Sequence, residues 1–149
     1  MLKDRLEKVY DNFKLSFYMN VFNSFEQEEE TLTLVEIIAC EVIYLFENPT
    51  ISELSNFMGV SQPNMTYRVN SLVKKGYVKK KVGKSDRRET RLELTDKFLQ
   101  YEKDKSGYIG LVSSRVEERF SKEEVDSLNR ILETIAEELM PECRNPADS

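Results

Sequence analysis

Apolar residues recur at steps of three and four along residues 2–22, which predicts an amphipathic helix with an aromatic-rich face. A glutamate-rich connector follows at residues 26–30. Residues 34–46 carry apolar side chains almost all the way round a helix, so we expect this segment to be the central buried helix. Asn48-Pro49 is expected to end it, because proline disfavours helix in the residue before it.

Helix starts are marked by hydroxyl residues with a glutamate three positions further on. In this capping-box pattern each side chain bonds the other residue's backbone N–H. The pairs are Thr33 with Glu36, Thr50 with Glu53, and Ser121 with Glu124.

Residues 50–76 have the pattern of a helix pair joined by a tight turn. Gly59 stands where the left-handed backbone costs least. Ser61 is suited to cap the second helix, and Pro63 is tolerated in its first turn. Gly76 ends that helix. The next segments, 77–82 and 89–95, read as strands, and together with the helix pair they predict a winged helix-turn-helix.

A long helix is expected over residues 96–119, and a further helix after Ser121. The latter has apolar residues at 3-4-3-4 spacing, as in a coiled coil. This apolar seam consists of Val125, Leu128, Leu132, Ile135 and Leu139. The terminal helices either pack on each other or join two chains. We expect a homodimer, because small domains seldom leave such stripes in water.

Composition excludes several classes of protein. No run of about 18 apolar residues exists, so we expect no membrane span, and the start lacks the apolar segment of a signal peptide. Cys40 and Cys143 do not form a CxxC motif, which fits a reducing cytoplasm. The chain has no histidine and no phosphate-loop pattern. We therefore predict no catalytic residues, no metal and no cofactor.

Charge is distributed unevenly along the chain. Residues 61–91 contain ten basic and two acidic residues, a net +8, whereas the whole chain carries −5 and the remainder therefore −13. Such polarity concentrates a positive field on one face. The lysines could simply solvate a strand pair, but beside a helix-turn-helix pattern they favour double-stranded DNA as the partner.

Residues 31–140 resemble the MarR family of bacterial transcription regulators in their order of elements. The sequence ISELSNFMGVSQPNMT resembles the family's helix-turn-helix, LVKKGYV its helix-to-strand junction, and SDRRETRLELT its wing. Two departures are Tyr67-Arg68, where a basic residue often precedes an apolar one, and the absence of a glycine shortly after Thr95.

The resemblance implies a mainly α fold with a small β-hairpin wing, in which the winged helix-turn-helix is flanked by N- and C-terminal dimerisation helices. We expect a dimerisation helix and connector over 1–30, the DNA-binding lobe over 31–95, dimerisation helices over 96–140 and a flexible tail over 141–149.

The candidate DNA-binding residues fall in two groups. The recognition helix would present Ser61, Gln62, Pro63, Asn64, Thr66, Tyr67 and Arg68 to the major groove. The wing would contribute Lys84, Ser85, Asp86, Arg87 and Arg88. Arg88 matches the family's wing arginine and would enter the minor groove, with Asp86 orienting it. Lys74, Lys75, Lys79 and Lys81 would strengthen the field without reading sequence.

Plainer interpretations remain open for these residues. Gln62 and Asn64 could cap the helix or be solvated, and Tyr67 could pack instead of binding phosphate. Asp86 and Arg88 could form a simple turn-stabilising pair.

The resemblance also implies an effector cleft between the dimerisation helices and the lobe. Its candidate lining is Tyr10, Phe13, Phe17, Tyr18 and Phe22, for which ordinary core packing is the alternative. Zinc-sensing relatives use histidine ligands, which this chain lacks. Cys40 is expected to be an inert buried residue, and Cys143 has no partner.

These features support a ligand-responsive homodimeric repressor that binds a short inverted repeat and a small-molecule effector. The alternative is a winged-helix protein-interaction module without sequence-specific DNA binding. A hydrolytic enzyme is a third class, against which the lack of histidine argues.

Overall fold

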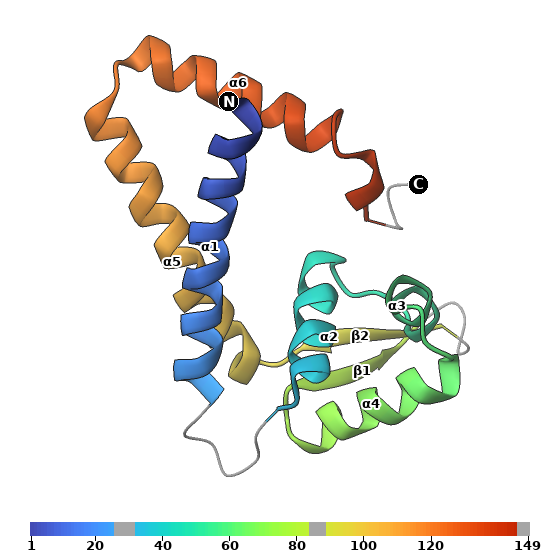
Figure 1. Ribbon diagram of the computed structural model, residues 1–149. Coiled ribbons are helices and arrows are strands. Elements are labelled where there is room, and N and C mark those ends of the chain that lie inside the picture. The colour runs from blue at the N-terminus through green and yellow to red at the C-terminus, as the bar shows by residue number, and fades with distance from the viewer. Residues whose placement is uncertain (26–31, 84–88, 146–149) are drawn as a thin grey trace. The chain divides into compact units, whose positions relative to one another are not determined.

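The computed structural model describes residues 1–25, 32–83 and 89–145 (Figure 1). Its elements are, in chain order, α1 (Leu2–Phe25), α2 (Leu34–Leu45), α3 (Ile51–Met58), α4 (Gln62–Lys74), β1 (Val78–Val82), β2 (Thr90–Leu94), α5 (Asp96–Arg119), α6 (Lys122–Glu137) and the 3-10 helix η1 (Pro141–Cys143). The predicted fold class, mainly helical with an antiparallel hairpin, is confirmed. The chain divides into two compact units, residues 1–103 and 104–149, each described below by itself.

The core of the first unit is built around α2, and Ala39 and Cys40 on this helix are completely buried. The buried apolar residues are Leu32, Ile37, Ala39, Cys40, Val42, Ile43, Phe46, Leu54, Met65, Val69, Leu72, Tyr77, Val78, Leu92, Phe98 and Tyr101. The prediction that α2 is central is confirmed. The prediction that this helix is buried on all sides is wrong for the single chain, since Leu34 is 66% exposed and Ile38 and Leu45 also face outward. The lobe packs against one side of this helix only.

The hydroxyl caps form as predicted, but the capping boxes differ. Ser121 and Glu124 form a complete box, with N–H···O distances of 2.9 and 3.3 Å. Thr33 accepts from the Glu36 N–H at 3.2 Å and Thr50 from the Glu53 N–H at 3.1 Å. Among the described residues neither glutamate returns a bond to its cap's N–H, so the prediction of full boxes at these two starts is wrong. Glu36 has a different partner, described below.

The turn between α3 and α4 follows the sequence prediction. Gly59 has φ +66° and Gly76 φ +84°, the left-handed conformations that glycine adopts at little cost. Ser61 caps α4 by accepting from the Asn64 N–H at 3.3 Å, and Pro63 lies in the first turn. The helix pair is therefore set by local backbone chemistry.

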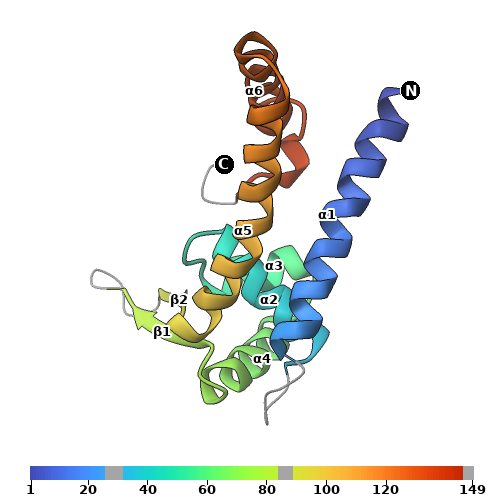
Figure 2. The same ribbon diagram turned by 90° about the vertical axis from the view of Figure 1, so that its left-hand side faces the viewer.

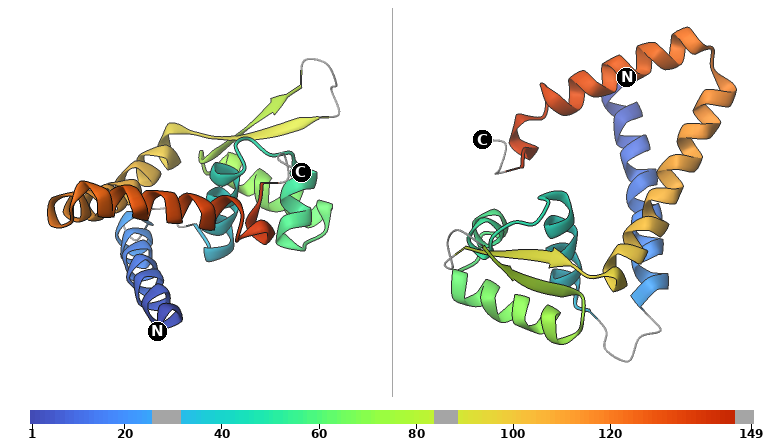
Figure 3. Two further views of the ribbon diagram at one scale, coloured as in Figure 1. Left: turned by 90° about the horizontal axis from the view of Figure 1, so that it is seen from above. Right: turned by 180° about the vertical axis from the view of Figure 1, so that it is seen from behind.

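The hairpin of β1 and β2 extends past the helices of the lobe (Figures 2 and 3). Val78 and Leu92 face the core and are buried. The register pairs Lys79 with Glu93 and Lys81 with Arg91, which places these four residues on the opposite face. On its other edge β2 bonds the chain before α3, through the Leu92 N–H and the Pro49 carbonyl at 2.9 Å.

Apolar residues are exposed at both ends of the chain. On α1, Leu6 and Val9 are exposed, whereas Phe17 and Val21 pack against the core. In the second unit no residue of α6 is buried. Leu139, the last residue of the predicted seam, lies beyond the end of α6. Arg144, which falls in the predicted tail, donates to the Glu137 carbonyl at 3.0 Å. None of the described helices is long and apolar enough to cross a membrane.

Candidate nucleic-acid interface

The two sides of α4 differ sharply in burial. Met65, Val69 and Leu72 are completely buried and fix the helix against the lobe. The other candidate side lies in solvent: Ser61, Gln62, Pro63, Asn64 and Tyr67 are exposed, and Thr66 and Arg68 are half-buried. The structure therefore brings the seven recognition-helix candidates together around the first two turns of α4.

Local hydrogen bonds separate the capping residues from those whose side chains are available. The cap role belongs to the Ser61 hydroxyl, and Asn64 contributes only its backbone N–H to it. Thr66 Oγ1 donates to the Gln62 carbonyl at 2.9 Å, which holds the hydroxyl along the helix. Tyr67 is 76% exposed, so packing does not account for it. Gln62, Asn64 and Tyr67 thus present polar groups to solvent.

The wing candidates fall between the described strands. Lys84, Ser85, Asp86, Arg87 and Arg88 lie outside the described residues. On either side of them, the Gly83 N–H donates to the Glu89 carbonyl at 2.8 Å and closes the strand pair. The hairpin that would carry the predicted wing contacts is therefore formed.

The strands on this hairpin carry lysines whose charge is partly compensated. Lys79 Nζ lies 3.7 Å from Glu93 Oε2, and Lys81 Nζ lies 3.3 Å from Glu93 Oε1. Arg91 pairs with Glu89. Glu93 lies just outside the window of residues 61–91, so the +8 counted from the sequence overstates the charge on this surface.

Lys75 does not act as the sequence predicted. Its ammonium donates to Glu36 Oε2 and Oε1 at 3.0 and 3.1 Å, and the Glu36 side chain is only 8% exposed. Lys75 is thus an internal tether rather than a contributor to the surface field. The sequence did not predict the pairing of Lys75 with Glu36, because 39 positions separate the two residues. Lys74 and Arg68 have no ion pair among the residues that the structure describes.

The comparison with family models finds one similarity for this lobe: the model described as "MarR family" matches residues 32–90. Over these residues the chain is similar to the MarR family. The matched segment runs from the start of the core to the first residue of β2, so it contains the helix pair and β1 but not the rest of β2.

Several solved structures share the fold over nearly the whole chain. FabT of Streptococcus pneumoniae, solved in complex with DNA, is 21% identical, with 93% of this chain and 97% of that chain covered and a TM-score of 0.61. A MarR family protein from Bacillus stearothermophilus is 21% identical over 93% and 92%, with a TM-score of 0.66. A MepR mutant from S. aureus, bound to an oligodeoxyribonucleotide, is 13% identical over 94% and 99%, with a TM-score of 0.52.

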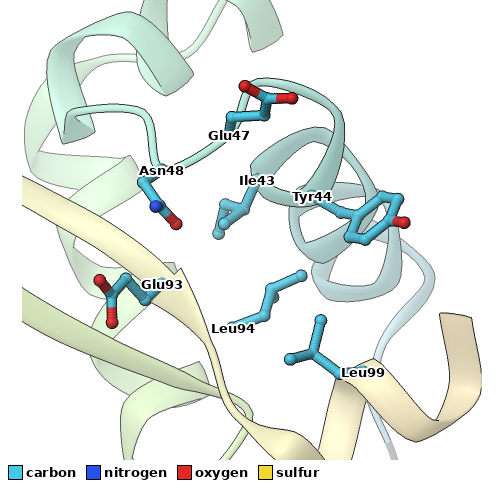
Figure 4. Close-up of a pocket in the computed structure, with 7 residues that line it drawn as sticks. All are labelled: Ile43, Tyr44, Glu47, Asn48, Glu93, Leu94 and Leu99. Atoms are coloured by element: carbon cyan, nitrogen blue, oxygen red, sulfur yellow. The ribbon is translucent and has the colours of Figure 1, made fainter.

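The lobe has a small pocket at the junction of α2, β2 and α5 (Figure 4). Its volume is about 170 Å³, and its lining is Ile43, Tyr44, Glu47, Asn48, Glu93, Leu94 and Leu99. The aromatic candidates for an effector cleft lie elsewhere, on α1. Of these, Tyr10, Tyr18 and Phe22 are exposed, Phe13 is half-buried, and Phe17 packs against the core.

Cys40 lies inside the lobe rather than at its surface. Burial raises the pKa of its thiol well above the ordinary range, and the carboxylates of Glu36 and Glu41 add to the effect. A neutral thiol is a poor nucleophile and a poor metal ligand. Among the described residues, no group of three histidines, cysteines or acids is arranged to hold a metal ion.

Proposed function

We propose that this protein is a sequence-specific DNA-binding transcription regulator, a homodimeric repressor that binds a short inverted repeat. The observation that carries the proposal is the difference in burial between the two sides of α4. Its buried side is locked into the core, while the first two turns offer base-reading side chains to solvent. The DNA complexes of FabT and the MepR mutant, which share this fold, support the same use of the lobe.

Each of the seven recognition-helix candidates has a chemical role in this proposal. Gln62 and Asn64 pair with adenine, and Arg68 pairs with guanine, each good bidentate pair discriminating by about 1–3 kcal/mol. Pro63 and Thr66 offer apolar contact to a thymine methyl. Ser61 and Tyr67 bind phosphates and fix the register of the helix.

The wing supplies contacts of a different kind. Arg88 enters the minor groove, where narrow A·T-rich segments have an enhanced negative potential. Asp86 orients Arg88 by an ion pair, and Lys84, Ser85 and Arg87 bind the backbone on either side. These contacts add affinity and select DNA shape rather than individual bases.

The exposed apolar stripes support a dimer. Leu128 and Leu132 of the seam are half exposed in the single chain, as are Leu6 and Val9 on α1. Pairing of these stripes would remove them from water. A two-fold dimer presents two copies of α4 about 34–36 Å apart, so the operator is an inverted repeat with half-sites one helical turn apart.

Repression and its control complete the proposal. A dimer seated on a promoter excludes the polymerase. A small-molecule effector that binds one spacing of the two recognition helices more tightly would shift DNA affinity through that difference alone. Tyr10, Tyr18 and Phe22, which α1 exposes together with the more buried Phe13 and Phe17, form the proposed aromatic lining.

The test is selection of bound sequences from random duplex DNA with the full chain, followed by affinity measurements against salt. We expect an enriched inverted repeat whose affinity falls steeply with salt. Arg68→Ala should weaken binding to that repeat, and Arg130→Ala on α6 is the matched control for the lost charge. No enrichment, with only weak salt-sensitive binding, would overturn the proposal and favour a protein-interaction module.

A further inference from the structure

The outer face of the wing carries a row of alternating charges. Strand alternation and register place Lys79, Lys81, Arg91 and Glu93 on the face opposite the buried Val78 and Leu92. Glu89 joins this row through its pair with Arg91. This face therefore carries three basic residues and two acidic residues.

Glu93 pairs with both lysines of this row. Each of its carboxylate oxygens faces a different lysine, Oε1 toward Lys81 at 3.3 Å and Oε2 toward Lys79 at 3.7 Å. The glutamate side chain is 24% exposed, whereas the two lysine side chains are 64% and 68% exposed. The carboxylate is thus held close to the strands while both ammonium groups remain within reach of a polyanion.

These ion pairs are expected to contribute little to the stability of the fold. Ion pairs that involve exposed lysines contribute little to stability, because water screens them and the long side chains lose freedom. The effect on a polyanion is larger, since every phosphate that a lysine neutralises releases counterions and strengthens binding to any sequence. One carboxylate shared by two lysines weakens that sequence-independent attraction.

We propose that Glu93 is a specificity-determining residue of the wing. Its carboxylate competes with DNA phosphates for Lys79 and Lys81 and keeps the affinity for random duplex low. Occupancy of a site then depends on the base contacts of α4. This inference rests on the proposed DNA-binding function and adds a residue that opposes binding to the residues that promote it.

The test compares Glu93→Gln with wild type on the selected operator and on a random-sequence duplex between 50 and 200 mM salt. Glutamine keeps the size of the side chain and removes its charge. We expect random-duplex affinity to rise severalfold, the salt slope to steepen by about 1–2, and the ratio of specific to random binding to fall. Glu133→Gln on α6 makes the same change in net charge and should leave all three quantities unchanged.

A second comparison separates charge competition from a change in folding. In the Glu93→Gln background, Lys79→Gln combined with Lys81→Gln should abolish the gain in affinity for random duplex. The same two lysine substitutions in wild type should lower that affinity much less. Equal behaviour of Glu93→Gln and Glu133→Gln on random duplex, with the operator still bound, would overturn the inference and leave the proposed function intact. Failure of wild type to select any sequence would instead overturn the proposed function itself.

Discussion

Lys75 donates to both carboxylate oxygens of Glu36, at 3.0 and 3.1 Å, and ties the end of α4 to the first turn of α2. The Thr33 hydroxyl donates to Glu36 Oε1 at 3.2 Å, and the Lys75 carbonyl accepts from Lys97 Nζ at 3.3 Å. The recognition helix is therefore connected to α2 and α5 by polar bonds as well as by apolar packing. Its position depends on this junction.

Breaking the tether should destabilise the lobe. Lys75→Met leaves the largely buried Glu36 carboxylate without its cation, and we expect a loss of about 3 kcal/mol in unfolding free energy. Urea denaturation measures it, with Lys74→Met on the exposed neighbouring position as the control. Glu36→Met combined with Lys75→Met should recover most of the loss, because the desolvated charge is then gone. Equal unfolding free energies for Lys75→Met and Lys74→Met would contradict this account.

Stability should fall above about pH 9 because of Cys40. Burial raises the pKa of this thiol above its ordinary 9.0, so the unfolded chain loses the proton first as the pH rises. Each proton lost only by the unfolded state costs about 1.4 kcal/mol per pH unit. Urea unfolding between pH 7 and 10.5 should show a shallower decline for Cys40→Ala than for wild type. An identical slope would place the responsible group elsewhere.

Tyr101 provides the control for that measurement. Burial, with Glu41 and Glu102 adding to it, raises the pKa of the Tyr101 hydroxyl above its ordinary 10.0. As for Cys40, the unfolded chain loses this proton first, so the contribution of Tyr101 to stability is lost only as the pH rises above 10.0. Tyr101→Phe should therefore flatten the decline at the alkaline end of the range and leave the part that begins near pH 9.

The turn after α2 stores strain in non-glycine residues. Glu47 and Asn48 have φ of +52° and +65°, and asparagine tolerates this region better than glutamate does. Glu47→Gly should be more stable than Glu47→Ala by about 1 kcal/mol, because alanine keeps the clash of its Cβ in the left-handed conformation. Thermal or urea unfolding of the two variants tests this. Greater stability of the alanine variant would show that the turn relaxes to another backbone conformation.

Charge placed in the α6 seam should split the dimer. Leu132 is 50% exposed in the single chain, so Leu132→Lys should leave each chain folded while burying a charge in the pair. The expected cost of several kcal/mol shifts sedimentation from dimer to monomer at micromolar concentration. Glu133→Lys on the adjacent exposed position is the control. A Leu132→Lys protein that sediments as a dimer would place the interface elsewhere.

Arg88 should contribute a groove contact rather than a general charge. Arg88→Ala is expected to weaken operator binding by about 1–3 kcal/mol, and more for operators with A·T-rich flanks than for G·C-rich ones. Fluorescence anisotropy with the two kinds of flank measures the difference, and Arg119→Ala at the end of α5 is the control. A loss that does not depend on the flank would assign Arg88 to phosphates.

The elements of this protein were predictable because their signals are local. Thr50 and Ser61 as caps, Gly59 in the left-handed region and the alternation around Leu92 depend on residues a few positions apart. Interactions over such distances act in any context and need no knowledge of the fold. The same reasoning identified the exposed face of α4, since the buried residues of a helix define its opposite side.

Pairings between distant residues were decided by the tertiary structure alone. Glu36 reads as a capping-box residue, yet its partner Lys75 is 39 positions away and reaches it only once α4 packs beside α2. Glu93 lies outside the basic window but compensates two of its lysines, because strand register and not sequence distance sets which charges meet. Periodicity marked α2 as apolar all round, and only the packed lobe decided that the face of Leu34 and Ile38 stays uncovered in the single chain. A sequence determines which faces must leave water, and the arrangement of the elements determines what each face meets.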